Sequence, residues 1–349
     1  MTYLDWLGVG LGVALPMLCA LLYPTWTWMM EPDWVERTRL LGFPFVLAEI
    51  AVIMLARRVG FDPREFWRNL PLDLKIGVVV LIVAMFVSSL SAKFPQDAVL
   101  QSIIQVIHLY FAVAVWDLAR RHGTSGLQRF WLWLTIGLVV MLVWSLGRLA
   151  IAPAAVKQLG ISFTPLVFLC TLRRLPKFEA MGRVSILTGL GLTLAYLMLP
   201  DDASFYLINT GEFALDDRAS SGRFSLWVAT WERWLDSPLL GWGTGSTFYE
   251  VYLGWTHTQP HNAFLQFLIS WGLVGAAAAL WLLGRALFAA HAAAIGQQRL
   301  WPYLGLIYAY CAMSMVDGSL YYPRFITIIM VAFAVILATK EDSGQARAS

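Results

Sequence analysis

The chain has 349 residues, of which 59% are hydrophobic and only 13% are charged. This composition excludes an ordinary water-soluble globular protein, because such proteins carry about 25% charged residues. The formal net charge of +3 does not indicate nucleic-acid binding, since the basic residues are scattered over short segments and form no continuous stripe. The sequence therefore predicts a protein embedded in a lipid bilayer, with residues 1–349 forming a single membrane domain.

Apolar runs close to the length that a bilayer requires predict an all-α, polytopic helix bundle. We expect ten spanning helices, near residues 6–25, 40–56, 76–92, 98–116, 130–151, 160–172, 184–199, 262–284, 303–316 and 325–339. Most of the 25 Lys and Arg residues fall in alternate connections between these runs. This asymmetry predicts that those connections and both chain termini lie in the cytoplasm.

One connection, residues 200–261, is much longer than the others and is expected on the extracytoplasmic side. Tryptophans recur at helical spacing in its second half, which predicts an amphipathic helix near residues 222–236 that lies along the membrane surface. Pro238 is expected to end this helix. The glycines of the following run, GWGTGS, suggest a phosphate-binding loop, but the run lacks the strand and the Lys-Ser/Thr of a P-loop and is expected to form a turn.

The segment from His261 onward carries the strongest candidate for chemistry. His261 and Asn262 follow Pro260 at the start of an apolar run that contains Gly272 and Gly275. On one continuous helix, Gly272 and Gly275 would lie about 20° and about 40° from His261 around the axis, so neighbouring helices could approach that face closely. The face would then point into the bundle, where an imidazole can accept a proton near neutral pH. A histidine that only hydrogen-bonds at the membrane interface is the alternative interpretation.

Four arginines on the expected outer side are candidates for binding an anionic group. They are Arg148 at the end of the 130–151 segment, Arg218 and Arg223 in the long connection, and Arg324 beside the last connection. A guanidinium keeps its charge and forms bidentate hydrogen bonds with phosphate oxygens, so two that converge on one pocket suit a diphosphate. For Arg148 the alternative is a side chain that only extends toward the lipid head groups.

These motifs resemble the O-antigen ligase and polymerase superfamily of bacterial membrane glycosyltransferases. His261-Asn262, nine residues, Gly272, two residues and Gly275 match the ligase motif H-[NSQ]-x9-G-x-x-[GTY]. The stretch SGRFSLW…DSPLLGWGTGSTF resembles the arginine-bearing helix and the hPLLGxGxG turn that precede that histidine. The resemblance is specific over residues 218–275 and architectural elsewhere, where the ten expected helices are two fewer than the twelve usual in such ligases.

The resemblance implies an O-antigen ligase in the bacterial inner membrane, with its active site facing the periplasm and with neither a metal ion nor another cofactor. The donor would be a glycan on undecaprenyl diphosphate and the acceptor a sugar hydroxyl of lipid A-core, with membrane lipids around the protein. It further implies that Arg148 and Arg223 bind the diphosphate and that His261 deprotonates the acceptor.

Three alternatives remain. Two belong to the same superfamily, a polymerase of O-antigen or exopolysaccharide and a protein O-oligosaccharyltransferase. The third is a transporter of lipid-linked glycans, which would place polar groups and broken helices near the membrane midplane. The sequence favours an enzyme, because its polar groups cluster at the outer surface and it shows no sign of a broken helix.

Overall fold

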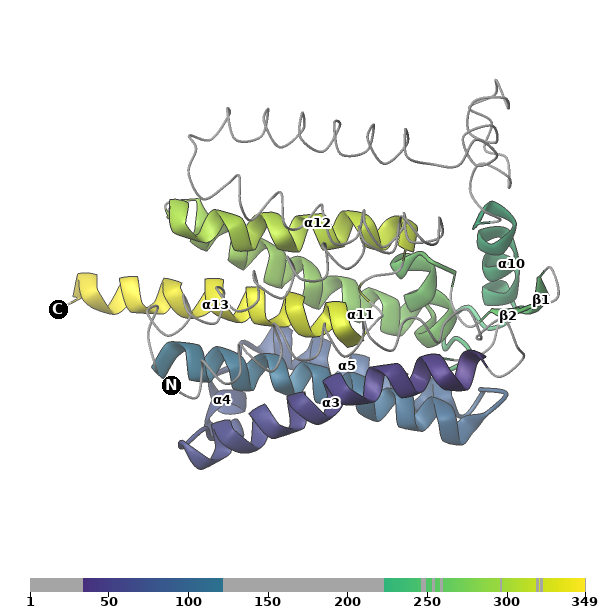
Figure 1. Ribbon diagram of the computed structural model, residues 1–349, viewed down its shortest axis with the longest axis horizontal. Helices are drawn as coiled ribbons and strands as arrows, with labels where there is room; N and C mark the ends of the chain where they lie inside the picture. The colour runs from purple at the N-terminus through teal and green to yellow at the C-terminus, as the bar shows by residue number, and fades with distance from the viewer. Residues whose placement is uncertain are drawn as a thin grey trace, which may run out of the picture.

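The computed structural model describes residues 34–121, 223–245, 249–252, 255–257, 260–295, 297–317, 320 and 323–348. Long helices run side by side and form a bundle, with one shorter helix set across one end (Figure 1). The long helices are α3 (Trp34–Arg58), α5 (Leu72–Ser89), the helix Pro95–Arg121, α11 (Ala263–Ala294), α12 (Trp301–Asp317) and α13 (Pro323–Ala348). The shorter elements are α4 (Pro63–Asn69), α10 (Arg223–Leu235), the 3-10 helix η4 (Gln298–Leu300) and an antiparallel hairpin of β1 (Tyr249–Tyr252) and β2 (Trp255–His257).

The predicted helical architecture is confirmed in the described part of the chain. Each of the predicted helices that falls on described residues is helical, although α11 extends ten residues beyond the expected end at 284. Among the described helices, Leu72–Ser89, Pro95–Arg121 and Ala263–Ala294 are long and apolar enough to cross a membrane. The β1–β2 hairpin is an addition that the sequence did not predict. The predicted helices near 6–25, 130–151, 160–172 and 184–199 lie outside the described residues.

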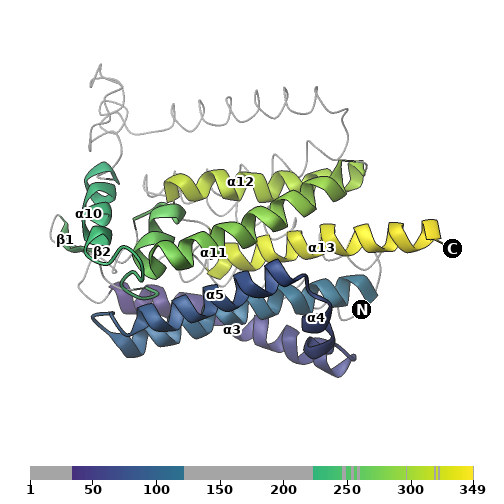
Figure 2. The same ribbon diagram turned by 180° about the vertical axis from the view of Figure 1, so that it is seen from behind.

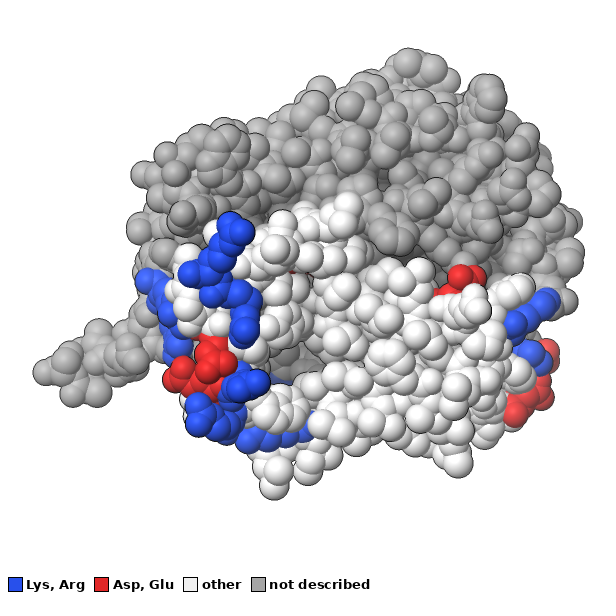
Figure 3. Space-filling model, turned by 90° about the horizontal axis from the view of Figure 1, so that it is seen from below, with Lys and Arg blue, Asp and Glu red and all other residues white. Residues whose placement is uncertain are grey.

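Charged side chains gather at the two ends of the bundle and leave a broad uncharged belt between them (Figure 3). The end where α3 passes into α4 is strongly basic and exposes Arg57, Arg58, Arg64 and Arg68. The helix α10 and the β1–β2 hairpin lie at the opposite end (Figure 2). The uncharged belt has the character of a surface that contacts lipid chains.

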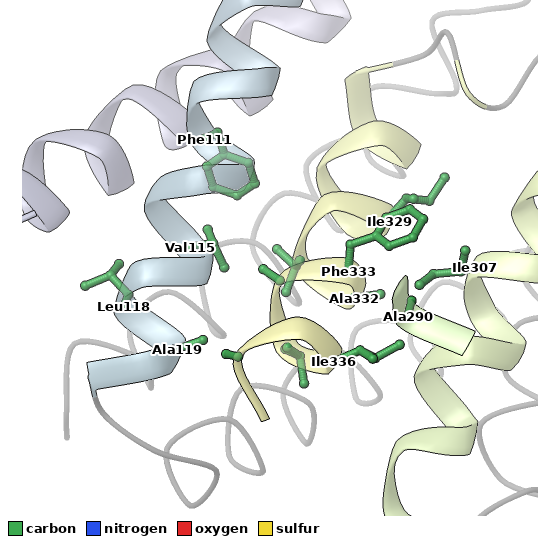
Figure 4. Close-up of a cluster of buried hydrophobic side chains, with 14 of the residues drawn as sticks. Phe111, Val115, Leu118, Ala119, Ala290, Ile307, Ile329, Ala332, Phe333 and Ile336 are labelled. Carbon is green, nitrogen blue, oxygen red and sulfur yellow. The ribbon is translucent and has the colours of Figure 1, made fainter. Parts of the chain in front are cut away.

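The two largest apolar clusters hold the long helices together. The larger one joins five helices in the half of the bundle near the basic end, with Phe111 and Val115 on one side of α13 and Ile307 on the other (Figure 4). Ala290 and Ala332 are fully buried in it, and small residues of this kind let membrane helices approach closely. The smaller cluster joins α5 to the first half of α11. Together the clusters hold α11 in place along its length.

Candidate active site

The helix α11 is broken at Gly272, whose backbone (φ 61°, ψ −170°) is not helical. The glycine-rich turn that follows α10, residues 236–245, enters the break. Four backbone hydrogen bonds join the two segments: Leu273 N–H to Pro238 O (2.8 Å), Val274 N–H to Leu239 O (3.4 Å), Trp242 N–H to Ile269 O (2.8 Å) and Gly243 N–H to Ser270 O (2.9 Å). Because a broken helix within a membrane leaves backbone groups that need partners, the turn replaces the hydrogen bonds that the helix loses.

Glycines allow the two backbones to touch. A Cβ atom at Gly272 would lie 2.2 Å from the carbonyl oxygen of Leu239, and one at Gly241 (φ 71°) would lie 2.5 Å from the nitrogen of Gly272. At Gly275 an added Cβ would lie 2.4 Å from the Cβ of Trp271 in the same helix and 3.0 Å from the Cβ of Ala84 on α5. Gly275 therefore leaves room for Trp271 as well as for the neighbouring helix expected there, whereas Gly272 admits the backbone of a turn.

His261 lies just before α11 and not on it. Its backbone has a φ of 54°, and it is the one non-glycine residue with a positive φ among those described. The expected face shared by His261, Gly272 and Gly275 is therefore wrong. It assumed an unbroken helix from residue 261, but α11 starts at Ala263 and is interrupted at Gly272.

Asn262 positions the histidine by joining two helices. Its side-chain oxygen accepts a hydrogen bond from the N–H of Leu265 (3.1 Å), which caps the start of α11. Its side-chain nitrogen donates to the carbonyl oxygen of Met315 near the end of α12 (2.9 Å). His261 as a whole is partly exposed, while the Nδ1 atom of its imidazole is buried. His261 therefore lies at the end of the bundle, and the residue that follows it, Asn262, is anchored to α11 and α12.

The helix α10 docks against the segment that carries His261. The Nε1–H of Trp227 donates a hydrogen bond to the carbonyl oxygen of Pro260 (2.8 Å). Arg223 lies one turn before Trp227 on the same face of α10, and its side chain is partly exposed. The predicted surface helix near 222–236 is thus found as Arg223–Leu235, and it brings Arg223 to the end of the bundle where His261 lies.

The side chains of the other three predicted arginines are not described by the structure. Arg148 and Arg218 lie outside the described residues. Arg324 is the second residue of α13, and its side chain lies outside the described part of the structure. Their predicted contacts with a diphosphate therefore stay predictions.

Thr244 is a residue of this region that the sequence did not single out. Its hydroxyl oxygen accepts a hydrogen bond from Trp271 Nε1–H and lies 2.8 Å from the hydroxyl oxygen of Ser102. Thr244 and Ser102 are fully buried. This small network fixes the glycine-rich turn to α11 and to the helix Pro95–Arg121.

The structure also contains two features that the sequence had not suggested. One is the broken helix α11. The other is a buried hydrogen-bonded pair, Glu49 with His108, deep among the spanning helices. The two partners stand 59 residues apart, and each looks isolated in its own apolar run. The sequence therefore showed no sign of the pair, and its main polar groups were expected at the outer surface.

Together these features define a polytopic helical membrane protein with a polar site at one end of its bundle. A family model described as O-antigen ligase matches residues 102–280, which is more than half of the chain. The chain therefore belongs to the O-antigen ligase family, whose members are glycosyltransferase-like membrane enzymes. The match includes α10, the glycine-rich turn, His261 and the break at Gly272. No curated protein matches the chain in a sequence comparison.

Proposed function

We propose that this protein is an O-antigen ligase that transfers a glycan from undecaprenyl diphosphate to a sugar hydroxyl of lipid A-core. One observation supports the proposal best. In a member of this family, Trp227 ties the helix that bears Arg223 to the residue before His261, so a cation and a base stand at the same end of the bundle.

His261 is the general base in the proposed reaction. Its imidazole takes the proton of the acceptor hydroxyl while the hydroxyl oxygen attacks the anomeric carbon of the donor sugar. The bond between that carbon and the diphosphate oxygen breaks, and undecaprenyl diphosphate leaves with the electron pair. Because attack and departure are in line, the anomeric configuration is inverted. We assign the proton-accepting role to Nε2, since Nδ1 is buried.

Arginines stabilise the charge that develops on the leaving diphosphate. We assign this role to Arg223 with Arg148, and we place Arg218 and Arg324 nearby as further cations. A guanidinium binds phosphate oxygens through two parallel hydrogen bonds and does not lose its charge. The mechanism needs no metal ion, because the arginines supply the positive charge.

The distribution of charge supports a periplasmic site. The strongly basic end of the bundle suits the cytoplasm by the positive-inside rule, and α10 with His261 lies at the other end. A lipid-linked donor and an amphipathic acceptor would both reach this end from the outer leaflet. We therefore place the protein in the bacterial inner membrane with its active site toward the periplasm.

Two kinds of alternative compete with the ligase. A polymerase or a protein O-oligosaccharyltransferase would use the same base and the same cations, and would differ in its acceptor. A transporter of lipid-linked glycans is favoured by the broken helix and the buried Glu49–His108 pair, which are features of transport proteins. In this protein, however, the backbone groups at the break are taken up by the glycine-rich turn, so they are not left to coordinate a transported ion.

Reconstitution in liposomes tests the proposal. The purified protein would be given undecaprenyl diphosphate-linked glycan in the presence of a chelator, with lipid A-core, a second lipid-linked glycan or a protein as acceptor. We expect transfer to lipid A-core with an inverted linkage, and no transfer by His261→Ala. His291→Ala is the matched control, since His291 lies near the far end of α11 beside Tyr308. Movement of the donor across the bilayer without transfer would contradict the proposal and support the transporter.

A further inference from the structure

Glu49, His108 and Thr327 form a buried polar cluster inside the helix bundle. The Nδ1 atom of His108 lies 2.6 Å from one carboxylate oxygen of Glu49, and the hydroxyl of Thr327 donates to the other at 2.6 Å. The exposed fractions of the three residues are 0%, 1% and 2%. Glu49 and His108 lie near the middle of α3 and of the helix Pro95–Arg121, while Thr327 lies in the second turn of α13.

The charge of this cluster depends on a proton. Among the described acidic and basic side chains, only Glu49, His108 and Asp117 are buried. Asp117 has two cations, Arg120 at 3.4 Å and Arg121 at 2.6 Å. Glu49 faces His108 and the uncharged Thr327 in the described structure. With one shared proton the Glu49–His108 pair is neutral overall, and without it a negative charge remains in the bundle at a high cost.

The second ring nitrogen of His108 indicates a missing partner. Nε2 is buried and has no hydrogen-bond partner in the described part of the chain. With the shared proton bound, Nε2 carries an N–H group wherever that proton sits between Nδ1 and Glu49, and without the proton Nε2 presents a lone pair. Buried polar atoms are rarely left unpaired, and bound water is the usual reason when the protein supplies no partner.

Two glutamines lie on the helix Pro95–Arg121 between its outer end and His108. Gln101, Gln105 and His108 are spaced i, i+4 and i+7, so they share one face of the helix Pro95–Arg121. Gln101 lies against the glycine-rich turn, because a Cβ atom at Gly245 would be 3.1 Å from its Cγ atom. Gln105 is buried one turn further along. In a helix as apolar as this one, a buried ionisable residue such as His108 is a functional candidate.

We propose that Glu49 and His108 form a proton-binding site with water bound at Nε2 of His108, reached from the outer end along Gln101 and Gln105. The site holds one exchangeable proton between the carboxylate and the imidazole. Water at Nε2 lets that proton exchange with the outer solvent. This proposal does not rest on the ligase activity, because the cluster shares no residue with the site around His261.

Solid-state NMR of the full-length protein in bilayers, with the five histidines labelled with nitrogen-15, tests the proposal. The His108 signals are assigned by their loss in His108→Gln. We expect polarisation transfer from water to Nε2 of His108, and a change in its imidazole signals when the pH is varied. Replacing Gln101 and Gln105 by leucine is expected to remove most of the transfer from water, and Glu49→Gln is expected to change the pH response.

Controls separate this result from a general disturbance. Thr339→Val alters another buried hydroxyl of α13 and is expected to leave the His108 signals unchanged. His261→Ala is expected to leave them unchanged as well, whatever it does to transfer. The decisive measurement is the water contact and the pH response of Nε2 in the wild-type protein, so it can be interpreted even if a variant fails to fold. A dry Nε2 with imidazole signals that do not respond to pH would overturn the proposal.

Discussion

Gly272 is the residue on which the local architecture most depends. Its φ of 61° with a ψ of −170° lies in a region that is essentially restricted to glycine, and the turn after α10 fills the place where a Cβ atom would stand. The ligase motif that the sequence resembles has a glycine at this position, and the structure supplies a reason for it. The sequence singled out His261, Asn262, Gly272 and Gly275, because each is a residue type with special chemistry or backbone freedom.

Replacing Gly272 by alanine is expected to destabilise the protein by about 1–3 kcal/mol, because the new Cβ atom would overlap Leu239. Gly284→Ala in the same helix is the control, since a Cβ there meets nothing within 4 Å and removing glycine from a helix stabilises it by roughly 0.5–1 kcal/mol. Thermal unfolding in detergent measures both. Equal unfolding temperatures for the two variants would contradict the inserted turn.

Asn262 is expected to matter through two separate hydrogen bonds. Asn262→Asp keeps the oxygen that caps α11 but loses the N–H group that donates to Met315, and it places a carboxylate beside a carbonyl oxygen. Asn262→Ala loses the cap as well, at a cost of about 1 kcal/mol. We expect both variants to lower transfer, which a reconstituted assay measures. Full transfer by Asn262→Asp would show that the link to Met315 does not position His261.

The helix α10 is the element that connects the two predicted catalytic groups. Its bounds were predictable to within one residue at each end, because the tryptophan spacing is regular and Pro238 follows. The break in α11 was not predictable from pattern, since the apolar run continues unchanged on both sides of Gly272. The hairpin was not predicted either, because β1 and β2 are only four and three residues long and too short to show a clear alternating pattern.

Trp227→Phe tests whether α10 positions the site. The change keeps an aromatic ring and removes the hydrogen bond to Pro260, so transfer is expected to fall by a factor of roughly 2–10, equivalent to about 0.5–1.5 kcal/mol. Trp231→Phe is the control on the same helix, because Trp231 is 45% exposed. Initial rates of glycan transfer measure both. Equal rates for the two variants would mean that the contact between Trp227 and Pro260 has no part in catalysis.

At the scale of the whole molecule, charge orders the structure along one axis. A strongly basic end, an uncharged belt and the end with α10 follow one another, as the loop charges of the sequence predict. The packing between helices that are distant in the chain could not be predicted from the sequence. The partnership of Glu49 with His108 depends on which helices become neighbours, and single apolar runs carry no information about that choice.

The orientation can be tested with single cysteines in a background that lacks the native ones. Glu232 is exposed on α10 and Arg64 is exposed on α4. A maleimide that does not cross membranes is expected to label Glu232→Cys in spheroplasts, and Arg64→Cys only after the membrane is permeabilised. The reverse pattern would place His261 in the cytoplasm and remove the periplasmic site from the proposed mechanism.

The central claim is that His261 and Arg223 act on one diphosphate-linked donor in different ways. Donor binding and the rate constant for transfer, measured separately for His261→Ala and Arg223→Ala, test it most directly. We expect His261→Ala to bind the donor normally but to lose about 10²–10⁴ in rate, as for a missing general base. Arg223→Ala should lower transfer at least about ten-fold and weaken donor binding, given ~1.5–3 kcal/mol for a charged hydrogen bond. Wild-type rates from His261→Ala would contradict the account.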